Sequence, residues 1–397
     1  MGISAEAPAR SSSKAPDPPV DNSGYLRLKA EIAPLPLKST EVGSRLSRNY
    51  FADPEILHAD SLYYLFITSG DSTRSTGATT AGLGIRCFSS SDLKNWRDRG
   101  LALDAHTSAC TFTQNTIWAP QALRGPDDAY YLFYNASGPE YEKARKGGWA
   151  SDSPYQRICV ARSERPAGPY IEYAAPLFDG QEIPGYADGK NGVVGTIDAY
   201  ALRDVNAEGH TRFYLYWSGI NDEKNQNLLW GAELREDLRG LKLPPEGPEP
   251  RILIGEPMEE WEKKACGKRR IAEAASVVKR GGKYYLLYSA NSFNTPEYAT
   301  GYAIGDTPLG PFKRADNNPI LKASPKWQER LRDRSTLIGP AGGSFLKDKQ
   351  GHADRIVFAS IDNQTTAARC DNDAGHCRNI RVKPIRFESD GALRVGN

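Results

Sequence analysis

The sequence lacks the features of a membrane protein and of a nucleic-acid-binding protein. It has no run of about 18 apolar residues, the length at which a membrane-spanning helix is expected. Lys and Arg together number 51, and Asp and Glu together number 49, which leaves a formal net charge of +2. This near balance gives no electrostatic attraction for nucleic acid or for an anionic membrane. We therefore expect neither as a partner.

Cysteine and histidine are also scarce, and their spacing excludes the common metal sites. The six cysteines form no C-x-x-C pair, and the five histidines are not spaced as ligands of one metal ion. Cys370 and Cys377 flank a short polar segment and could form a disulfide, or all six cysteines could be reduced, mostly buried thiols. No cofactor is expected.

The N-terminal residues carry no apolar segment of the kind found in a secretory leader. Residues 1–22 are rich in Ser, Pro, Ala and Lys and have little to bury, so we expect a disordered tail before one domain over residues 23–397. Two interpretations are open: a cytoplasmic protein, or a secreted protein whose leader has been removed. We favour secretion, with which the glycosylation triplets at Asn135 and Asn363 agree weakly.

The residues that are plentiful are aromatic, with 20 Tyr and 7 Trp, and they mark a repeat. A short aromatic or apolar strand recurs five times, each time after a turn-forming polar or Gly cluster, and a second apolar strand follows each copy. The first kind of strand covers residues 62–66, 129–133, 212–216, 283–287 and 355–359, and the second kind covers residues 83–88, 157–161, 228–232, 300–304 and 380–384.

The repeat predicts an all-β fold, a five-bladed β-propeller. Each of the five units has about 70 residues, several short strands and no long helical periodicity. A β-sandwich or a β-helix is the alternative, but a sandwich does not repeat as five similar units.

A third element precedes each aromatic strand, and in three units it carries an acid. These acids are Asp53, Asp198 and Glu273, and each stands among small or apolar neighbours. Because the first strand of a propeller blade lines the central axis, equivalent positions are expected to converge there. Three convergent carboxyl groups are costly unless they bind something, share protons or perform chemistry. The alternative is that each acid caps a strand end or pairs with an Arg.

Such a cluster suits the hydrolysis of a glycosidic bond. One carboxylic acid protonates the leaving oxygen atom and one carboxylate activates a water molecule, and in an inverting enzyme the two stand about 6.5–9.5 Å apart. A third acid can keep the pKa of the proton donor high by repulsion. A non-catalytic propeller that only binds carbohydrate is the alternative from another class, and it has no need of the cluster.

Several short motifs resemble those of glycoside hydrolase family 43, which contains five-bladed propellers that act as arabinofuranosidases, arabinanases and xylosidases. The resemblance extends from about residue 50 to the C-terminus. The matching motifs are Ala52-Asp53-Pro54 with Tyr63-Tyr64, Ser90-Ser91-Asp92-Leu93 with Trp96, Trp118-Ala119-Pro120, Ile197-Asp198, and Glu273 with Tyr284-Tyr285.

By position, the resemblance implies that Asp53 is the general base, Glu273 the general acid, and Asp198 the residue that orients the acid and sets its pKa. Trp118 matches an axial aromatic residue that could stack on the sugar or pack between blades. Phe51 shares a strand face with Asp53 and could line the pocket. The implied function is an inverting hydrolase that releases terminal α-L-arabinofuranose from arabinan, arabinoxylan or derived oligosaccharides. β-Xylosidase, endo-arabinanase and galactofuranosidase activities are the alternatives within the same fold.

The fifth unit departs from the family pattern. Many relatives carry a His on the axis within a Gly-Pro-Gly-His motif, whereas this chain has Gly339-Pro340-Ala341-Gly342-Gly343, so Gly342 stands at the position of the imidazole. Asp198-Ala199 and Glu273-Ala274-Ala275 also differ from the Asp-Pro and Glu-Gly-Pro that are common in the family. We therefore expect no metal site on the axis, and activity without a divalent metal.

Overall fold

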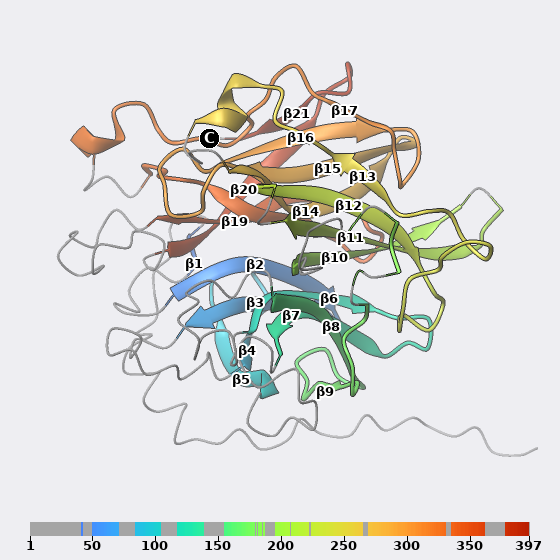
Figure 1. Ribbon diagram of the computed structural model, residues 1–397. Coiled ribbons are helices and arrows are strands. Elements are labelled where there is room, and N and C mark those ends of the chain that lie inside the picture. The colour runs from blue at the N-terminus through green and yellow to red at the C-terminus, as the bar shows by residue number, and fades with distance from the viewer. Residues whose placement is uncertain are drawn as a thin grey trace, which may run out of the picture.

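The computed structural model describes residues 41–42, 50–70, 84–104, 117–138, 155–178, 180, 182–184, 186, 195–206, 208–221, 224–264, 269–330, 335–361 and 378–396. The expected tail over residues 1–22 and the pair Cys370 and Cys377 lie outside these ranges. Strands make up almost all of the regular structure (Figure 1). Within the described ranges, no helix has the length and apolar character needed to cross a membrane.

Five antiparallel units follow one another along the described chain, and consecutive strands pair within each. Unit 1 contains β2 (Tyr50–Ala59), β3 (Leu62–Gly70), β4 (Gly84–Ser90) and β5 (Arg97–Asp104). Unit 2 contains β6 (Ile117–Arg124), β7 (Tyr130–Ser137), β8 (Gln156–Ser163) and β9 (Ile171–Glu172). Unit 3 contains β10 (Gly195–Val205), β11 (Thr211–Asn221), β12 (Gln226–Leu234) and β13 (Arg251–Ile254). Unit 4 contains β14 (Arg270–Arg280), β15 (Lys283–Ala290), β16 (Ala299–Gly305) and β17 (Phe312–Arg314). Unit 5 contains β18 (Ala341–Lys347), β19 (Ala353–Ile361), β20 (Arg378–Phe387) and β21 (Leu393–Val395).

Two pairings join segments that belong to different parts of the chain. Strand β1 (Glu41–Val42) pairs antiparallel with β20, so an N-terminal strand completes the sheet of unit 5. Strands β12 and β14 share a short parallel pairing that links units 3 and 4. The short 3₁₀ helices η3 (Glu260–Lys263) and η4 (Trp327–Arg330) lie in the connections that follow β13 and β17.

The second and third strands of a unit are largely continuous apolar sequences because both faces of each sheet are covered. In β7 all eight residues are buried. The apolar clusters that cover these faces each combine two neighbouring units: unit 1 with 2, 2 with 3, 3 with 4, 4 with 5, and 5 with 1. The last cluster packs Ile56 and Leu65 against Val357 and Ile380. The core is therefore divided among the interfaces between units.

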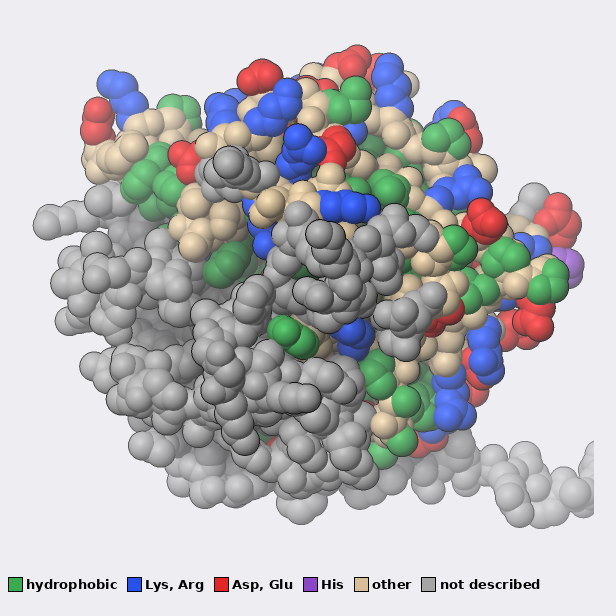
Figure 2. Space-filling view, in the orientation of Figure 1, with side chains coloured by type: hydrophobic (Ala, Val, Ile, Leu, Met, Phe, Trp, Pro, Cys, Tyr) green, Lys and Arg blue, Asp and Glu red, His purple; other side chains and the backbone are tan. Residues whose placement is uncertain are grey.

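The first strands of neighbouring units lie against one another. Strand β2 contacts β6, β6 contacts β10, β10 contacts β14, β14 contacts β18, and β18 contacts β2. All ten strands predicted from the repeat are present, several of them longer than predicted, and the fold is all-β as expected. On the surface, Lys and Arg side chains are interspersed with Asp and Glu over the described part of the face in Figure 2, in keeping with the balanced charge.

Candidate active site

A β-bulge interrupts the first strand of every unit at the same place. One residue of each bulge has the left-handed backbone conformation, with φ between 48° and 61°. For a residue with a Cβ atom this conformation costs about 1–2 kcal/mol, and such strain concentrates at functional sites. The five left-handed residues are Asp53, Ala119, Asp198, Ala274 and Gly342.

Asp53 and Asp198 therefore occupy equivalent positions, as predicted, whereas Glu273 does not. Glu273 is the residue before the bulge of unit 4, and it corresponds in register to Trp118 of unit 2. The expectation that all three acids occupy equivalent positions in their first strands is therefore wrong for Glu273 by one residue. The apolar pattern alone does not locate the extra residue of a bulge. The three carboxyl groups are still close enough for Glu273 and Asp53 to raise the pKa of Asp198.

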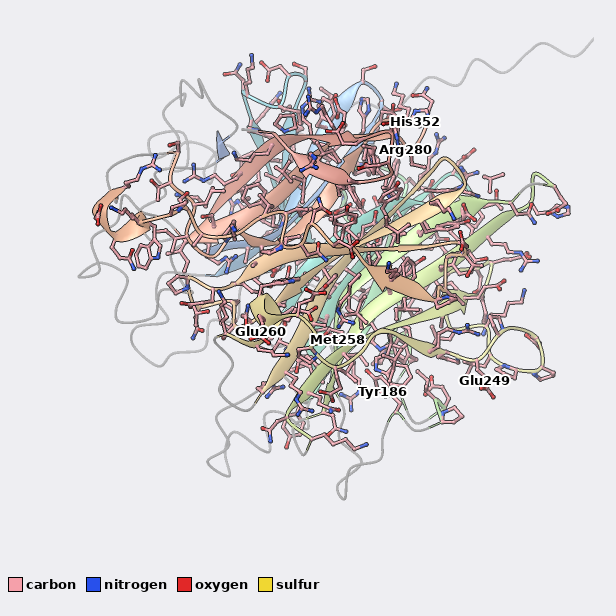
Figure 3. The ribbon with its side chains drawn as sticks, turned by 90° about the horizontal axis from the view of Figure 1, so that it is seen from above. Tyr186, Glu249, Met258, Glu260, Arg280 and His352 are labelled. Carbon is pink, nitrogen blue, oxygen red and sulfur yellow. The ribbon has the colours of Figure 1, made fainter. Side chains whose placement is uncertain are left out.

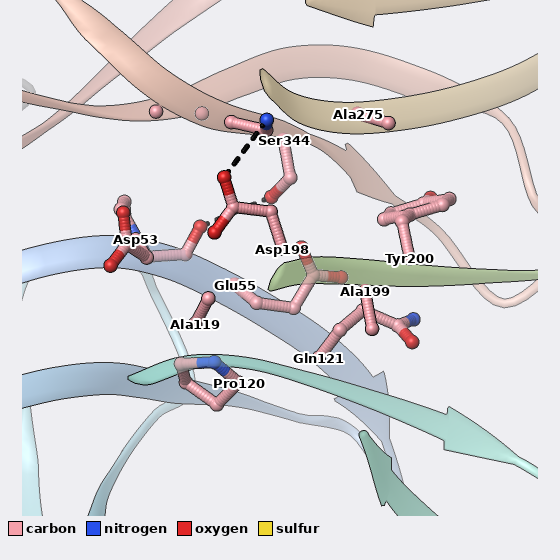
Figure 4. Close-up of a pocket in the computed structure, with 14 residues that line it drawn as sticks. Asp53, Glu55, Ala119, Pro120, Gln121, Asp198, Ala199, Tyr200, Ala275 and Ser344 are labelled. Atoms are coloured by element: carbon pink, nitrogen blue, oxygen red, sulfur yellow. Dashed lines mark hydrogen bonds between the residues drawn. The ribbon is translucent and has the colours of Figure 1, made fainter. Parts of the chain in front are cut away.

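The bulges surround a small cavity of about 40 Å³ (Figure 4). All five left-handed residues contribute to its wall, and Asp53 and Asp198 are the acids among them. Further along the strands its wall includes Glu55, Gln121 and Tyr200. The cavity marks the place where the five first strands meet.

Asp198 is oriented by backbone hydrogen bonds on two sides. Its Oδ2 accepts a hydrogen bond of 3.1 Å from the backbone N–H of Ala274 (dashed in Figure 4). Its own backbone N–H donates to Asn135 Oδ1 at 3.3 Å. Burial raises the pKa of Asp198 well above its usual range, and the charges of Glu273 and Asp53 raise it further. Burial and the neighbouring carboxyl groups thus favour the protonated form of Asp198.

The pKa of Glu273 is raised towards neutral pH. The hydroxyl group of Tyr298 donates a hydrogen bond of 2.9 Å to its Oε1. Burial raises the pKa of Glu273 to about 7; the charge of Asp53 also raises it, while Tyr298, Arg269 and Asn227 lower it. A general acid works best when its pKa lies near the working pH. Glu273 therefore has a substantial protonated fraction at neutral pH.

Asp53 is held by the hydroxyl group of Thr68. Thr68 Oγ1 donates a hydrogen bond of 2.8 Å to Asp53 Oδ2, and it accepts one of 2.7 Å from the backbone N–H of Ala119. Burial raises the pKa of Asp53, while the hydrogen bond from Thr68 and the positive charge of Arg378 oppose this shift. The hydroxyl and guanidinium groups thus favour the carboxylate form that a general base needs.

The bulges of other units are held in the same way. A polar side chain from the second strand of one unit accepts a hydrogen bond from the backbone N–H of the left-handed residue in the next unit. The pairs are Thr68 with Ala119, Asn135 with Asp198, and Ser289 with Gly342. Asn135 is fully buried. The use of its triplet as a sign of glycosylation and secretion is therefore wrong.

Tyr298 and Arg378 complete the site, and no sequence motif predicts either of them. Arg378 is 3% exposed, and its guanidinium carbon lies 5.1 Å from the centroid of the Tyr298 ring. The guanidinium group donates hydrogen bonds of 2.6 to 3.4 Å to the backbone carbonyl oxygens of Phe293, Gly339, Ala341 and Ala359. Arg378 therefore fixes the ring whose hydroxyl group contacts Glu273.

Gly342 lies close to both Asp53 and Tyr298. A Cβ atom at this position would lie 3.4 Å from Asp53 Oδ1 and 3.6 Å from the Tyr298 hydroxyl oxygen. The absent side chain at Gly342 is the signal in the sequence that other side chains, here Asp53 and Tyr298, approach this position. In the part of the chain that the structure describes, no group of three His, Cys, Asp or Glu side chains is arranged to hold a metal ion.

The structure gives less information on the two predicted sugar-binding residues, Trp118 and Phe51. Trp118 is half-buried in β6, directly before the bulge, and it does not line the 40 Å³ cavity. Stacking on a sugar and packing between units both stay predictions for it. Phe51 belongs to β2, but its side chain lies outside the described part of the structure. The side chains of Cys87 and Cys159 are buried.

Several known proteins are similar to this chain in sequence and in fold. The profile of "Glycosyl hydrolases family 43" matches residues 46–393. The chain is 24% identical over 289 residues to a β-D-galactofuranosidase of Aspergillus niger, which covers 69% of this chain and 66% of that protein. It is 27% identical over 350 residues to an extracellular endo-α-(1→5)-L-arabinanase of Thermotoga petrophila, with 81% and 62% covered. The chain thus spans less than two thirds of the length of these two relatives. The crystal structure of a thermostable family-43 glycoside hydrolase matches with a TM-score of 0.64 at 25% identity, over 88% of this chain and 93% of that one.

Proposed function

The chain belongs to glycosyl hydrolase family 43, and from this membership we propose that it is an inverting glycoside hydrolase. The observation that carries the proposal is the cluster formed by the half-buried acids Asp53, Asp198 and Glu273. Within it, burial brings the pKa of Glu273 to about 7, while Asp53 is hydrogen-bonded as a carboxylate acceptor. These two groups supply the acid and the base that hydrolysis of a glycoside requires.

Each carboxyl group has a separate task in the proposed reaction. Glu273 donates its proton to the leaving oxygen atom as the bond from this atom to the anomeric carbon breaks. Asp53 takes a proton from a water molecule whose oxygen atom attacks the anomeric carbon from the opposite face, so the product has the inverted configuration. Asp198 accepts a hydrogen bond from the backbone N–H of Ala274, the residue after Glu273, and so orients that segment. The charge repulsion between Asp198 and the other two carboxyl groups favours a proton in the cluster.

We propose that the five units are the blades of a closed five-bladed propeller. Three observations support closure: the contact of β18 with β2, the apolar cluster shared by units 5 and 1, and the pairing of β1 with β20. In such a ring all first strands face one axis. Closure accounts for the meeting of carboxyl groups that come from units 1, 3 and 4.

As substrate we propose terminal α-L-arabinofuranose on arabinan, on arabinoxylan or on oligosaccharides derived from them. The names of the two relatives, an endo-α-(1→5)-L-arabinanase and a β-D-galactofuranosidase, support a furanose-containing substrate. β-Xylosidase, endo-arabinanase and galactofuranosidase activities are the competing specificities. The Thermotoga petrophila relative is described as extracellular, which supports our proposal that this chain is secreted.

A panel of 4-nitrophenyl glycosides tests the proposed function. We expect the fastest release of nitrophenol from the α-L-arabinofuranoside, and slower release from the β-D-xylopyranoside and the β-D-galactofuranoside. NMR spectra recorded at the start of the reaction should show the inverted anomer first. A variant that combines Asp53→Asn with Glu273→Gln is the control for contaminating activity. Binding of arabinan without hydrolysis of any glycoside would favour the carbohydrate-binding alternative, and a retained anomer would contradict the mechanism.

The variant Tyr298→Phe is expected to move the alkaline limb of the pH profile. The Tyr298 hydroxyl group stabilises the ionised form of Glu273, so its removal raises the pKa of this acid. Because a general acid must be protonated, kcat/KM falls as the pH rises through that pKa. We expect the limb to move up by about one to two pH units, since hydrogen bonds to charged groups contribute about 1.5–3 kcal/mol and one pKa unit corresponds to about 1.4 kcal/mol.

The control for Tyr298→Phe is Tyr285→Phe, which removes a hydroxyl group bonded to the carbonyl oxygen of Gly391, away from the cluster. The pH profile of kcat/KM should be recorded for both variants and for the wild-type protein. An unmoved limb in Tyr298→Phe, or a limb displaced to lower pH, would show that the hydroxyl group does not tune Glu273.

A further inference from the structure

A second, larger cavity lies toward the other ends of the same first strands. Its volume is about 560 Å³, within the range of small-molecule sites. Its wall consists of the later residues of the first strands and of the turn after β18, including His352, which is labelled in Figure 3. Glu55, Gln121 and Tyr200 line both this cavity and the 40 Å³ cavity, so the two adjoin along the axis.

The wall of this cavity carries polar groups without a hydrogen-bond partner among the described residues, among them the ammonium group of Lys347 and Nδ1 of His58. The Lys347 side chain is half-buried, and Nζ lies 4.8 Å from the centroid of the Tyr200 ring. Among the described residues, this nitrogen atom has neither a hydrogen-bond acceptor nor an ion-pair partner in contact. A half-buried ammonium group that contacts no protein acceptor takes its hydrogen bonds from water or from a bound molecule. A bound molecule with an anionic oxygen atom would supply such an acceptor.

Glu55 lines the same cavity and interacts with Lys347 across a gap. Its side chain is 7% exposed, and it makes no ion pair with Lys347. Burial raises the pKa of Glu55 to about 7 and lowers the pKa of Lys347 to about 8, and the charge of each group partly opposes the shift of the other. A molecule between them would need an acceptor for the ammonium group and a donor for the carboxyl group.

Lys279, Asp204 and His352 on the wall already have partners. Lys279 Nζ lies 3.0 Å from Asp204 Oδ1, and the hydroxyl group of Tyr284 donates to Asp204 Oδ2 at 2.7 Å. His352 Nδ1 lies 3.4 Å from Asp348 Oδ2. These groups are therefore not available in the way that Lys347 is.

We propose that this cavity binds a small hydroxylated organic anion, such as a sugar acid or a sugar phosphate. Its carboxylate or phosphate group accepts hydrogen bonds from Lys347, and one of its hydroxyl groups donates to Glu55. Charge-assisted hydrogen bonds of this kind are stronger than neutral ones. The site is separate from the carboxyl cluster and does not depend on the proposed hydrolytic activity.

Isothermal titration calorimetry of the full chain with D-gluconate, D-glucose 6-phosphate and uncharged D-glucose tests the proposal. At least one of the two anions should bind at millimolar concentrations, and D-glucose should bind at least tenfold more weakly. Lys347→Met should weaken anion binding at least tenfold, a factor that corresponds to about 1.4 kcal/mol. The matched control is Lys283→Met, which removes an exposed lysine that pairs with Asp306 outside the cavity.

Binding of only one anion would identify carboxylate or phosphate as the recognised group and would support the proposal. Lys347→Arg retains the charge, and it should keep anion binding even if Lys347→Met folds poorly, which thermal unfolding would reveal. Glu55→Gln should weaken D-gluconate more than hexanoate, which has no hydroxyl groups. Equal binding of D-glucose and the anions, no saturable binding of either anion, or undiminished binding by a folded Lys347→Met variant would each overturn the proposal.

Discussion

Asp53→Asn is expected to lower kcat by about a hundred-fold to ten-thousand-fold, the usual contribution of a positioned general base. The amide keeps the volume of the carboxyl group and can still accept the hydrogen bond from Thr68, but it cannot take a proton from water. Asn also tolerates the left-handed backbone conformation that residue 53 adopts, with φ of 48°. The loss of activity should therefore come without loss of the fold.

The measurement is kcat and KM on the α-L-arabinofuranoside, together with thermal unfolding of each variant. Asp60→Asn is a matched control, because Asp60 directly follows β2, has φ of 47° and is exposed. It should behave like the wild-type protein. If Asp53→Asn stays folded and keeps more than about a tenth of the wild-type kcat, Asp53 is not the general base.

Glu273→Gln is expected to reduce the hydrolysis of natural oligosaccharides by a similar factor, about a hundred-fold to ten-thousand-fold. Aryl glycosides with good leaving groups should be partly spared, since their leaving oxygen atom needs little protonation. The pH profile should change as well. Wild-type activity should fall as the pH rises through the pKa of Glu273, which burial raises to about 7, because the proposed acid loses its proton; the variant should lack this limb.

The comparison requires one activated substrate, the 4-nitrophenyl α-L-arabinofuranoside, and one unactivated substrate, an arabinose disaccharide. Glu297→Gln removes an exposed acid of the same unit, directly before Tyr298, and it should change neither the rates nor the pH profile. Equal losses on both substrates, with the alkaline limb still present, would assign the acid role to another group.

The strands were predictable because the core lies between sheets. A strand such as β7, Tyr130–Ser137, is covered on both faces, so its residues form an aromatic and apolar run that repeats from unit to unit. Asp53, Asp198 and Glu273 were predictable for a related reason. Acids embedded in apolar first strands stand out against that background, and the first strands do lie against one another.

The remaining features of the site depend on geometry that a sequence pattern does not record. The register of Glu273 was wrong by one residue because a bulge adds a residue without changing the apolar composition of the strand. Tyr298 reaches Glu273 from the loop before β16 of the same unit, and Arg378 reaches Tyr298 from the start of β20 in the next unit. The charges of Glu55 and Lys347 interact only because units 1 and 5 are neighbours in space.

The hydroxyl group of Thr68 has a consequence for how this protein can evolve. It donates to Asp53 in its own unit and accepts the N–H of Ala119 in the next, so one side chain sets both the ionisation of an acid and the shape of a neighbouring strand. Residues that share a partner have non-additive mutational effects. Substitutions at positions 53, 68 and 119 should therefore be epistatic, because the effect of each depends on the residues at the other two. Evolutionary change at these positions has to proceed through combinations of substitutions.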